Sequence, residues 1–121
     1  MHELSIADSI VAIAVRNAKG KQVVAVEVAV GELRQVVPDA LAFAFDLVAA
    51  GTAVEGAELR IETVPVRVAC TRCGEESRVR GFPFRCPRCE STEIEVVAGE
   101  ELSVEALELE EGAERTPAGR R

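Results

Sequence analysis

Residues 70–89 read CTRCGEESRVRGFPFRCPRC, with a C-x-x-C pair at each end and twelve residues between the pairs. The two-residue gap lets a tight turn point both sulfurs of a pair at one metal ion. Two such turns complete a tetrahedron of thiolates. The spacing therefore predicts a zinc ribbon that holds one structural zinc ion, with no ligand position left open for catalysis. The predicted ligands are Cys70, Cys73, Cys86 and Cys89.

Two other interpretations of the four cysteines are weaker. Two disulfides require an oxidising compartment, and a redox-active C-x-x-C motif opens a helix and needs only one pair. The apolar segment at residues 6–15 contains Asp8 and follows Glu3 rather than a basic region, so it is expected to be a helix and not a signal peptide. We therefore expect a cytoplasmic protein whose thiols stay reduced.

The charge of the chain changes at the cysteine segment. Residues 66–91 contain six basic and three acidic residues and carry +3, and since the whole chain carries −7, the remainder carries −10. This contrast predicts that the segment is a separate module. The acidic balance argues against general nucleic-acid binding and against an anionic membrane as partner.

Hydrophobic periodicity predicts regular elements on both sides of this module. Ser5 followed by Asp8 resembles a capping box and places the start of the first helix there. The second helix is apolar almost all round and is expected to be buried between neighbours. The charged residues from Glu110 onward indicate a frayed end of the chain. Residues 112–121 are predicted to be a disordered tail. The predicted helices are 4–19 and 38–50, and the predicted strands are 21–30, 57–64, 93–98 and 102–110.

The amino terminus offers a second metal site. His2 is the one histidine of the chain, and its imidazole and amide nitrogen lie next to the α-amine of Met1. Three nitrogens in one plane suit Ni(II) or Cu(II). Glu3 can supply the fourth donor, and the sequence does not decide between its amide and its carboxylate. A histidine near a chain end usually only faces solvent, so composition alone does not establish this site.

Several motifs together resemble the HypA/HybF family of nickel metallochaperones for hydrogenase maturation, over residues 1 to about 110. The resemblance rests on Met1-His2-Glu3, Leu41-Ala-Phe-Ala-Phe-Asp-Leu-Val48, Gly51-Thr, Glu55-Gly-Ala57, Cys70-x-x-Cys73 and Cys86-Pro-x-Cys89. It implies an α+β fold, with a small β-sheet packed on two helices and an inserted four-cysteine zinc ribbon. The implied domains are 1–65 completed by strands from about 95–111, and 66–94.

The resemblance also implies a function and partners. Nickel is expected at Met1, His2 and Glu3, as transient Ni(II) cargo, and structural Zn(II) at the cysteines. The protein would deliver nickel for assembly of the nickel-iron hydrogenase active site. Its partners would be a hydrogenase maturation GTPase, the immature hydrogenase large subunit and, in some members, urease maturation proteins.

Other functions remain open from the residues alone. The chain has no G-x-x-x-x-G-K-[ST] loop and no candidate nucleophile with a base, so we do not expect an enzyme. The main alternative is a zinc-ribbon protein that binds nucleic acid, with Phe82 and Phe84 stacking on bases. A further alternative is a structural adaptor, for which Ni(II) would have no effect.

Overall fold

The computed structural model describes residues 2–79, 84–110 and 115–117, and the chain divides into two compact units. The helix–sheet unit consists of residues 1–29, 36–62 and 102–121, and the ribbon unit consists of residues 30–35 and 63–101. This division follows from which residues pack together. It does not test the domain limits expected from the sequence, which stay a prediction. None of the helices in the described part of the chain has the length and apolar character that a bilayer crossing requires.

Helix α1, His2–Ala18, packs one apolar face into the helix–sheet unit. The prediction that it starts near Ser5 is wrong, because the helix begins at His2. Glu3 explains the earlier start: a carboxylate is favourable at the positive end of a helix, and its Oε2 accepts a hydrogen bond from the Val37 N–H at 3.3 Å. The buried residues of α1 are Ile6, Ala7, Ile10, Val11, Ile13, Ala14 and Ala18.

Helix α2, Pro38–Ala49, begins at the proline that the sequence places in its first turn. Its inner side, formed by Leu41, Ala44, Phe45 and Ala49, is buried. The expectation that this helix is buried on all sides is wrong, because Phe43 is 67% exposed and Leu47 is 59% exposed. Neighbouring elements cover only the inner side of α2, so its apolar outer side faces solvent.

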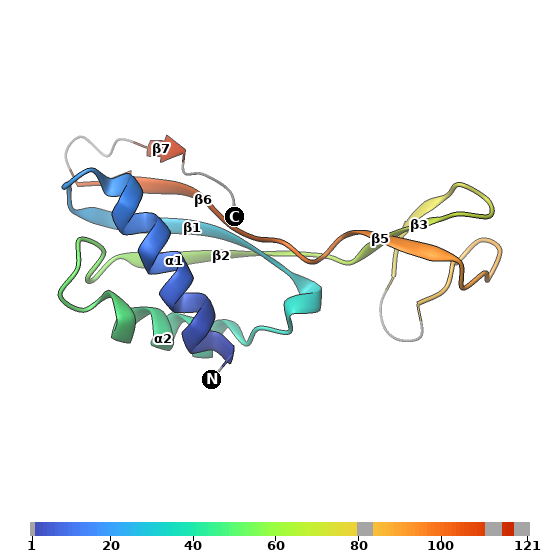
Figure 1. Ribbon diagram of the computed structural model, residues 1–121, viewed down its shortest axis with the longest axis horizontal. Helices are drawn as coiled ribbons and strands as arrows, with labels where there is room; N and C mark the ends of the chain where they lie inside the picture. The colour runs from blue at the N-terminus through green and yellow to red at the C-terminus, as the bar shows by residue number, and fades with distance from the viewer. Residues whose placement is uncertain (1, 80–83, 111–114, 118–121) are drawn as a thin grey trace. The chain divides into compact units, whose positions relative to one another are not determined.

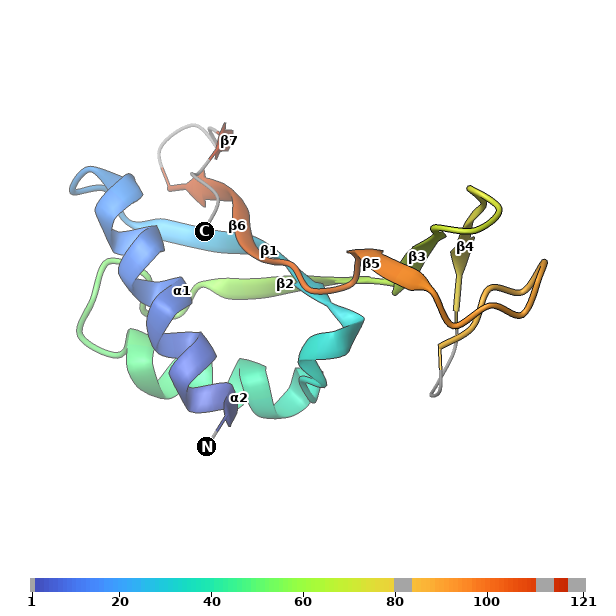
Figure 2. The ribbon, with the colours of Figure 1, turned by 45° about the vertical axis from the view of Figure 1, so that its right-hand side comes forward.

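The sheet of the helix–sheet unit has the strand order β2-β1-β6-β7. Strand β1 is central, between β2 and β6, and Val26 and Val28 within it are 0% and 1% exposed. Figures 1 and 2 show both helices on the same side of this sheet. The strands are β1 Val23–Gly31, β2 Glu58–Val64, β6 Leu102–Leu109 and β7 Arg115–Pro117.

Strand β7 lies within the segment that the sequence predicts to be a disordered tail. It pairs antiparallel with β6, with Leu107 opposite Thr116. Residues 111–114 and 118–121 of that segment lie outside the described residues. Two helices, small sheets and a four-cysteine cluster confirm the α+β fold class expected from the sequence.

The ribbon unit contains a small antiparallel sheet in the order β4-β3-β5. The pairing of β3 with β5 shifts register between Arg67 and Val68, as in a β-bulge. The core is small: Val66, Val68 and Val79 are buried, and Leu33, Phe84, Ile94 and Val96 pack partly buried against them. The strands are β3 Arg67–Cys70, β4 Glu76–Arg78 and β5 Ile94–Ala98.

A short 3₁₀ helix, η1 (Glu32–Arg34), is attached to this sheet although it follows β1 directly in the chain. The Val66 N–H donates to Glu32 Oε1 at 2.9 Å, and the Leu33 N–H donates to the Gly99 carbonyl at 2.8 Å. A Cβ at Gly31 would lie 2.1 Å from the Gly99 oxygen, so only glycine permits this approach. The ribbon unit is therefore assembled from two separate stretches of chain.

Candidate metal centre

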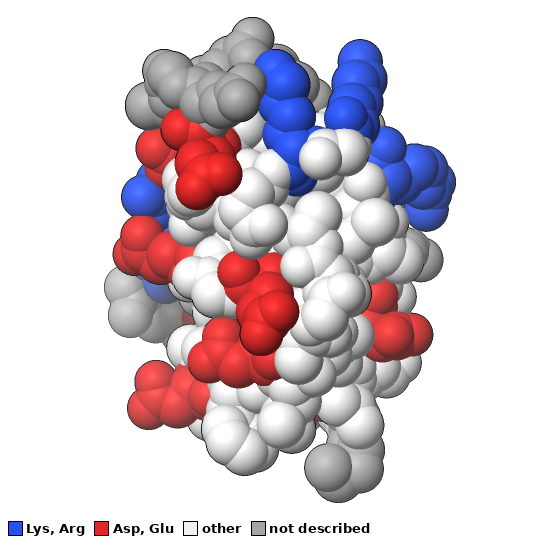
Figure 3. Space-filling view, turned by 90° about the vertical axis from the view of Figure 1, so that its left-hand side faces the viewer, with Lys and Arg blue, Asp and Glu red and all other residues white. Residues whose placement is uncertain are grey.

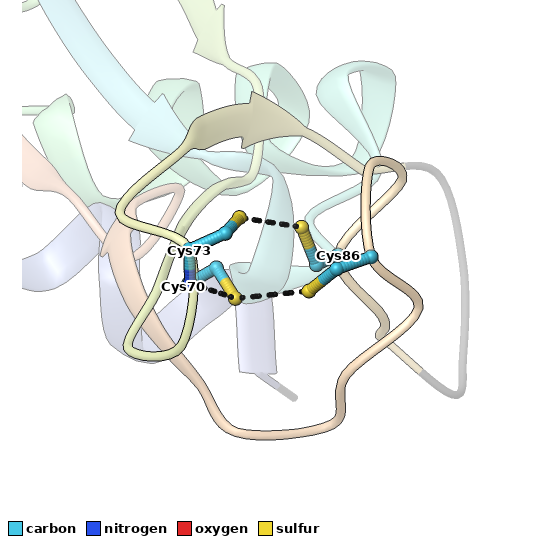
Figure 4. Close-up of side chains that lie close together, drawn as sticks. Cys70, Cys73 and Cys86 are labelled. Atoms are coloured by element: carbon cyan, nitrogen blue, oxygen red, sulfur yellow. Dashed lines mark hydrogen bonds between the residues drawn. The ribbon is translucent and has the colours of Figure 1, made fainter.

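The four cysteines lie close together in the ribbon unit, and Figure 4 labels three of them, Cys70, Cys73 and Cys86. Cys70 is the last residue of β3, and the sulfurs of Cys70 and Cys89 and those of Cys73 and Cys86 are each 3.6 Å apart. All four sulfurs lie within 4.8 Å of one another. A zinc–sulfur distance of about 2.3 Å corresponds to sulfur–sulfur edges of about 3.8 Å in a regular tetrahedron. The cluster therefore fits one tetrahedral metal ion.

The cysteines are free thiols, and the first cysteine of each pair is more deeply buried than the second. Cys70 and Cys86 are 3% and 1% exposed, whereas Cys73 and Cys89 are exposed. The 3.6 Å separations exceed the disulfide bond length of about 2.05 Å, so the pairs are not disulfides. This is the arrangement of a closed thiol site at the surface of a small module.

The two cysteine turns have the same backbone hydrogen bonds. In each turn the N–H of the first cysteine donates to the carbonyl five residues on, and its own carbonyl accepts from the N–H four residues on. Equivalent turns present their sulfurs in equivalent directions, which is what a symmetric tetrahedral site requires. The bonds are Cys70 N to Glu75 O at 2.9 Å, Gly74 N to Cys70 O at 2.9 Å, Cys86 N to Ser91 O at 3.0 Å and Glu90 N to Cys86 O at 2.8 Å.

Gly74 and Glu90 occupy the same place in these two turns, and both have positive φ, 79° and 62°. An L-residue in this conformation costs about 1–2 kcal/mol, so Glu90 adopts a geometry that suits glycine better. Replacing Glu90 by Gly is expected to stabilise the ribbon unit by up to about 1 kcal/mol. The measurement is unfolding of the zinc-loaded protein followed by circular dichroism.

Two control variants define this test. Gly74→Ala is expected to destabilise the ribbon unit by about 1 kcal/mol, because no atom lies within 4 Å of the added Cβ and only backbone strain acts. Glu93→Gly, at an exposed residue without positive φ, is expected to give no stabilisation. Equal stabilisation by Glu90→Gly and Glu93→Gly would contradict the explanation.

Backbone N–H groups in the turns favour the ionised form of the first cysteine of each pair. The N–H of Cys73 holds the pKa of Cys70 at about 6, well below the usual value for a thiol. The N–H of Cys89 lowers the pKa of Cys86 in the same way. Thiolates are the metal-binding form of cysteine, so these two residues are prepared for coordination.

The second cysteine of each pair is shifted in the opposite direction. The N–H of Glu75 lowers the pKa of Cys73, but desolvation and the three neighbouring thiols together outweigh it and raise that pKa to about 11. The N–H of Ser91 lowers the pKa of Cys89, but the thiols of Cys70 and Cys86 and desolvation outweigh it and raise that pKa. Four thiols this close cannot all ionise unless a cation lies among them, so the donor set matches a metal ion.

The amino-terminal residues lie in the helix–sheet unit. Met1 is outside the described residues, and His2 is the exposed first residue of α1. The first N–H groups of an α-helix have no acceptor within the helix, so the His2 amide nitrogen is not part of the helical hydrogen-bond ladder. The structure therefore places His2 at the surface with its backbone nitrogen outside that ladder.

The Glu3 carboxylate has a structural role that the sequence does not signal. Its hydrogen bond from the Val37 N–H, together with that from its own N–H, lowers the pKa of Glu3 below the usual value. Because its pKa is lower in the folded state, the carboxylate stabilises the fold above its usual pKa, and this contribution is lost as the pH falls through the lowered value. Val37 precedes α2, so the hydrogen bond joins the starts of the two helices.

The fold and the thiol cluster together define a two-unit α+β protein with a metal-binding ribbon. A family model described as "Hydrogenase/urease nickel incorporation, metallochaperone, hypA" matches residues 1–109. The chain belongs to the HypA family, as the sequence motifs predicted.

Similar proteins cover nearly the whole chain. A "Hydrogenase maturation factor HypA" from Geobacter metallireducens is 48% identical over 110 residues, which are 91% of this chain and 100% of that protein. One from Nostoc is 40% identical over 92% of this chain and 97% of its own length. The "Solution structure of the Ni metallochaperone HypA from Helicobacter pylori" matches with a TM-score of 0.66 and 24% identity, over 90% of this chain and 97% of that one, which supports the fold.

Proposed function

We propose that this protein is a nickel metallochaperone that delivers Ni(II) for assembly of the nickel-iron hydrogenase active site. The observation that carries the proposal is the family match over residues 1–109, which spans both the amino terminus and the four-cysteine cluster. It acts by binding and transfer and not as an enzyme, so energy for delivery comes from a partner. We place it in the cytoplasm, where cysteine thiols stay reduced.

The metal of the ribbon unit is proposed to be one structural Zn(II). Its ligands are Cys70, Cys73, Cys86 and Cys89, whose separations and equivalent turns support a closed tetrahedral site. Four thiolates select zinc over the harder divalent cations, and a filled coordination shell supplies no open position for a substrate. Zinc in this site holds the ribbon together and takes no part in a reaction.

The nickel is proposed to bind at Met1, His2 and Glu3 as cargo. The α-amine of Met1, the amide nitrogen of His2 and its imidazole form two fused chelate rings in one plane, which suits Ni(II). The exposed position of His2 at the start of α1 supports access for a metal. Glu3 is proposed as the fourth donor, by its amide or its carboxylate, and its carboxylate accepts a hydrogen bond from the Val37 N–H.

The alternative of a nucleic-acid-binding ribbon has less support. Phe84 packs partly buried against the ribbon core instead of presenting an open face for stacking, and Phe82 lies outside the described residues. On the face drawn in Figure 3, acidic side chains are spread widely and basic side chains gather toward one end. This face therefore lacks the continuous basic surface that nucleic-acid binding relies on.

The proposed partners are a hydrogenase maturation GTPase, the immature hydrogenase large subunit and urease maturation proteins. The GTPase is expected to dock on the helix–sheet unit near the amino terminus, because nickel then crosses only a short distance. A Cys73→Ser chain, in which zinc is lost, should therefore bind the GTPase with unchanged affinity in isothermal titration calorimetry. Loss of GTPase binding in this variant, with the helix–sheet unit still folded, would place the docking site on the ribbon unit instead.

A further inference from the structure

The outer side of helix α2 combines apolar and acidic side chains in a regular pattern. Phe43 and Leu47, one helical turn apart, are 67% and 59% exposed. Asp39 lies one turn before Phe43 and Asp46 lies three residues after it, so the two carboxylates flank the apolar pair, and both are exposed. Helix α2 contains no lysine or arginine.

Packing among the residues that the structure describes does not explain the apolar character of the outer side of α2. The inner side of α2 already provides a buried face, in which Phe45 and Leu41 are 0% exposed. The chain has only four phenylalanines and no other aromatic residue, yet one of the four is held mostly in water. An apolar helix is normally covered on both sides, and an apolar patch with a polar rim is typical of an interaction surface.

We propose that the outer face of α2, formed by Asp39, Phe43, Asp46 and Leu47, is a docking surface for a partner protein. The segment that binds is an amphipathic helix with apolar anchors and lysine or arginine beside them. Its anchors pack on Phe43 and Leu47, and its cations pair with Asp39 and Asp46.

Charge complementarity identifies this class of partner and disfavours two other occupants. A second copy of the chain, docked through the same face, would bring the carboxylates of the two α2 helices together with no cation on either helix. An anionic membrane would be repelled by Asp39 and Asp46. This surface lies on α2 alone, and its docking role does not depend on which metals the protein binds.

The test is an NMR titration of the full-length, zinc-loaded protein with a synthetic amphipathic helical peptide of leucine and lysine. Its counterpart carries glutamate in place of every lysine at the same positions. The lysine peptide should shift the amide signals of α2 around Phe43 and Leu47, and the glutamate peptide should bind at least about tenfold more weakly. Added salt should weaken the binding of the lysine peptide.

Three variants assign the binding to the proposed face. The double variant Phe43→Ser/Leu47→Ser should lose at least about tenfold in affinity, and Asp39→Asn/Asp46→Asn should lose affinity and most of its salt dependence. Val24→Ser, at another exposed apolar residue on β1, should bind as the unaltered protein does. All these positions are exposed, so the fold should be retained, which signal dispersion in the NMR spectrum checks.

Other results would overturn the inference. These are shifts centred outside α2, equal affinity for the two peptides, or unchanged affinity in Phe43→Ser/Leu47→Ser. Analytical ultracentrifugation gives a separate check: a dimer that this double variant abolishes would show that the occupant is a second copy.

Discussion

Replacing Cys73 by Ser is expected to release the zinc ion and unfold the ribbon unit, while the helix–sheet unit keeps its structure. A hydroxyl is a poor zinc ligand, and in the described part of the ribbon the buried members of the core are Val66, Val68 and Val79. In small zinc modules the metal contributes an apparent 10–16 kcal/mol, about an order of magnitude more than the burial of one valine. The ribbon therefore depends on its metal far more than on its core.

Elemental analysis and NMR spectra together measure this effect. The unaltered protein, kept reduced, should contain one zinc per chain, and Cys73→Ser should contain none and lose the dispersed signals of residues 63–79 and 84–101. Arg72→Ser, at an exposed residue inside the same C-x-x-C pair, is the matched control and should keep its zinc. Reduced protein without zinc, or Cys73→Ser with a full zinc content, would contradict this account.

Replacing His2 by Ala is expected to abolish Ni(II) binding while zinc content and fold stay unchanged. The substitution removes the imidazole and with it one of the two chelate rings, and the chain has no other histidine to replace it. In the unaltered protein, nickel binding should weaken as the pH falls, because protons compete with the metal for its nitrogen ligands.

A nickel titration followed by absorption spectroscopy measures this loss. Ser5→Ala, at an exposed residue three positions after His2 in the same helix, is the control and should bind nickel as the unaltered protein does. Undiminished nickel affinity in His2→Ala would exclude the amino-terminal site. A parallel loss of zinc would show instead that the substitution acts through the fold.

The cysteine cluster and most of the elements could be predicted because they depend on local patterns. The C-x-x-C spacing determines a thiol turn whatever surrounds it, and the first pair shows the glycine that such a turn favours. The second pair has Glu90 in the equivalent conformation, which no sequence pattern signals. Likewise Pro38 marks the start of α2 locally, without reference to the rest of the fold.

The features that escaped prediction depend on contacts between distant residues. The hydrogen bond of Glu3 to Val37 spans 34 positions, and it accompanies a helix start earlier than Ser5. Attachment of η1 to the ribbon rests on Glu32 and Val66, also 34 positions apart. The exposure of Phe43 depends on which other elements pack against α2. When a helix is apolar on nearly all sides, its hydrophobic periodicity does not indicate which side is covered.

Moving the α-amine tests whether nickel binds at the amino terminus, separately from zinc. The measurement is a Ni(II) titration of tag-free protein beside a chain with a short Gly-Ser extension before Met1. The extension keeps every side chain and moves only the amine. We expect one bound Ni(II) per unextended chain, loss of that binding in the extended chain, and one zinc in both. Equal nickel affinity of the two chains would contradict this expectation.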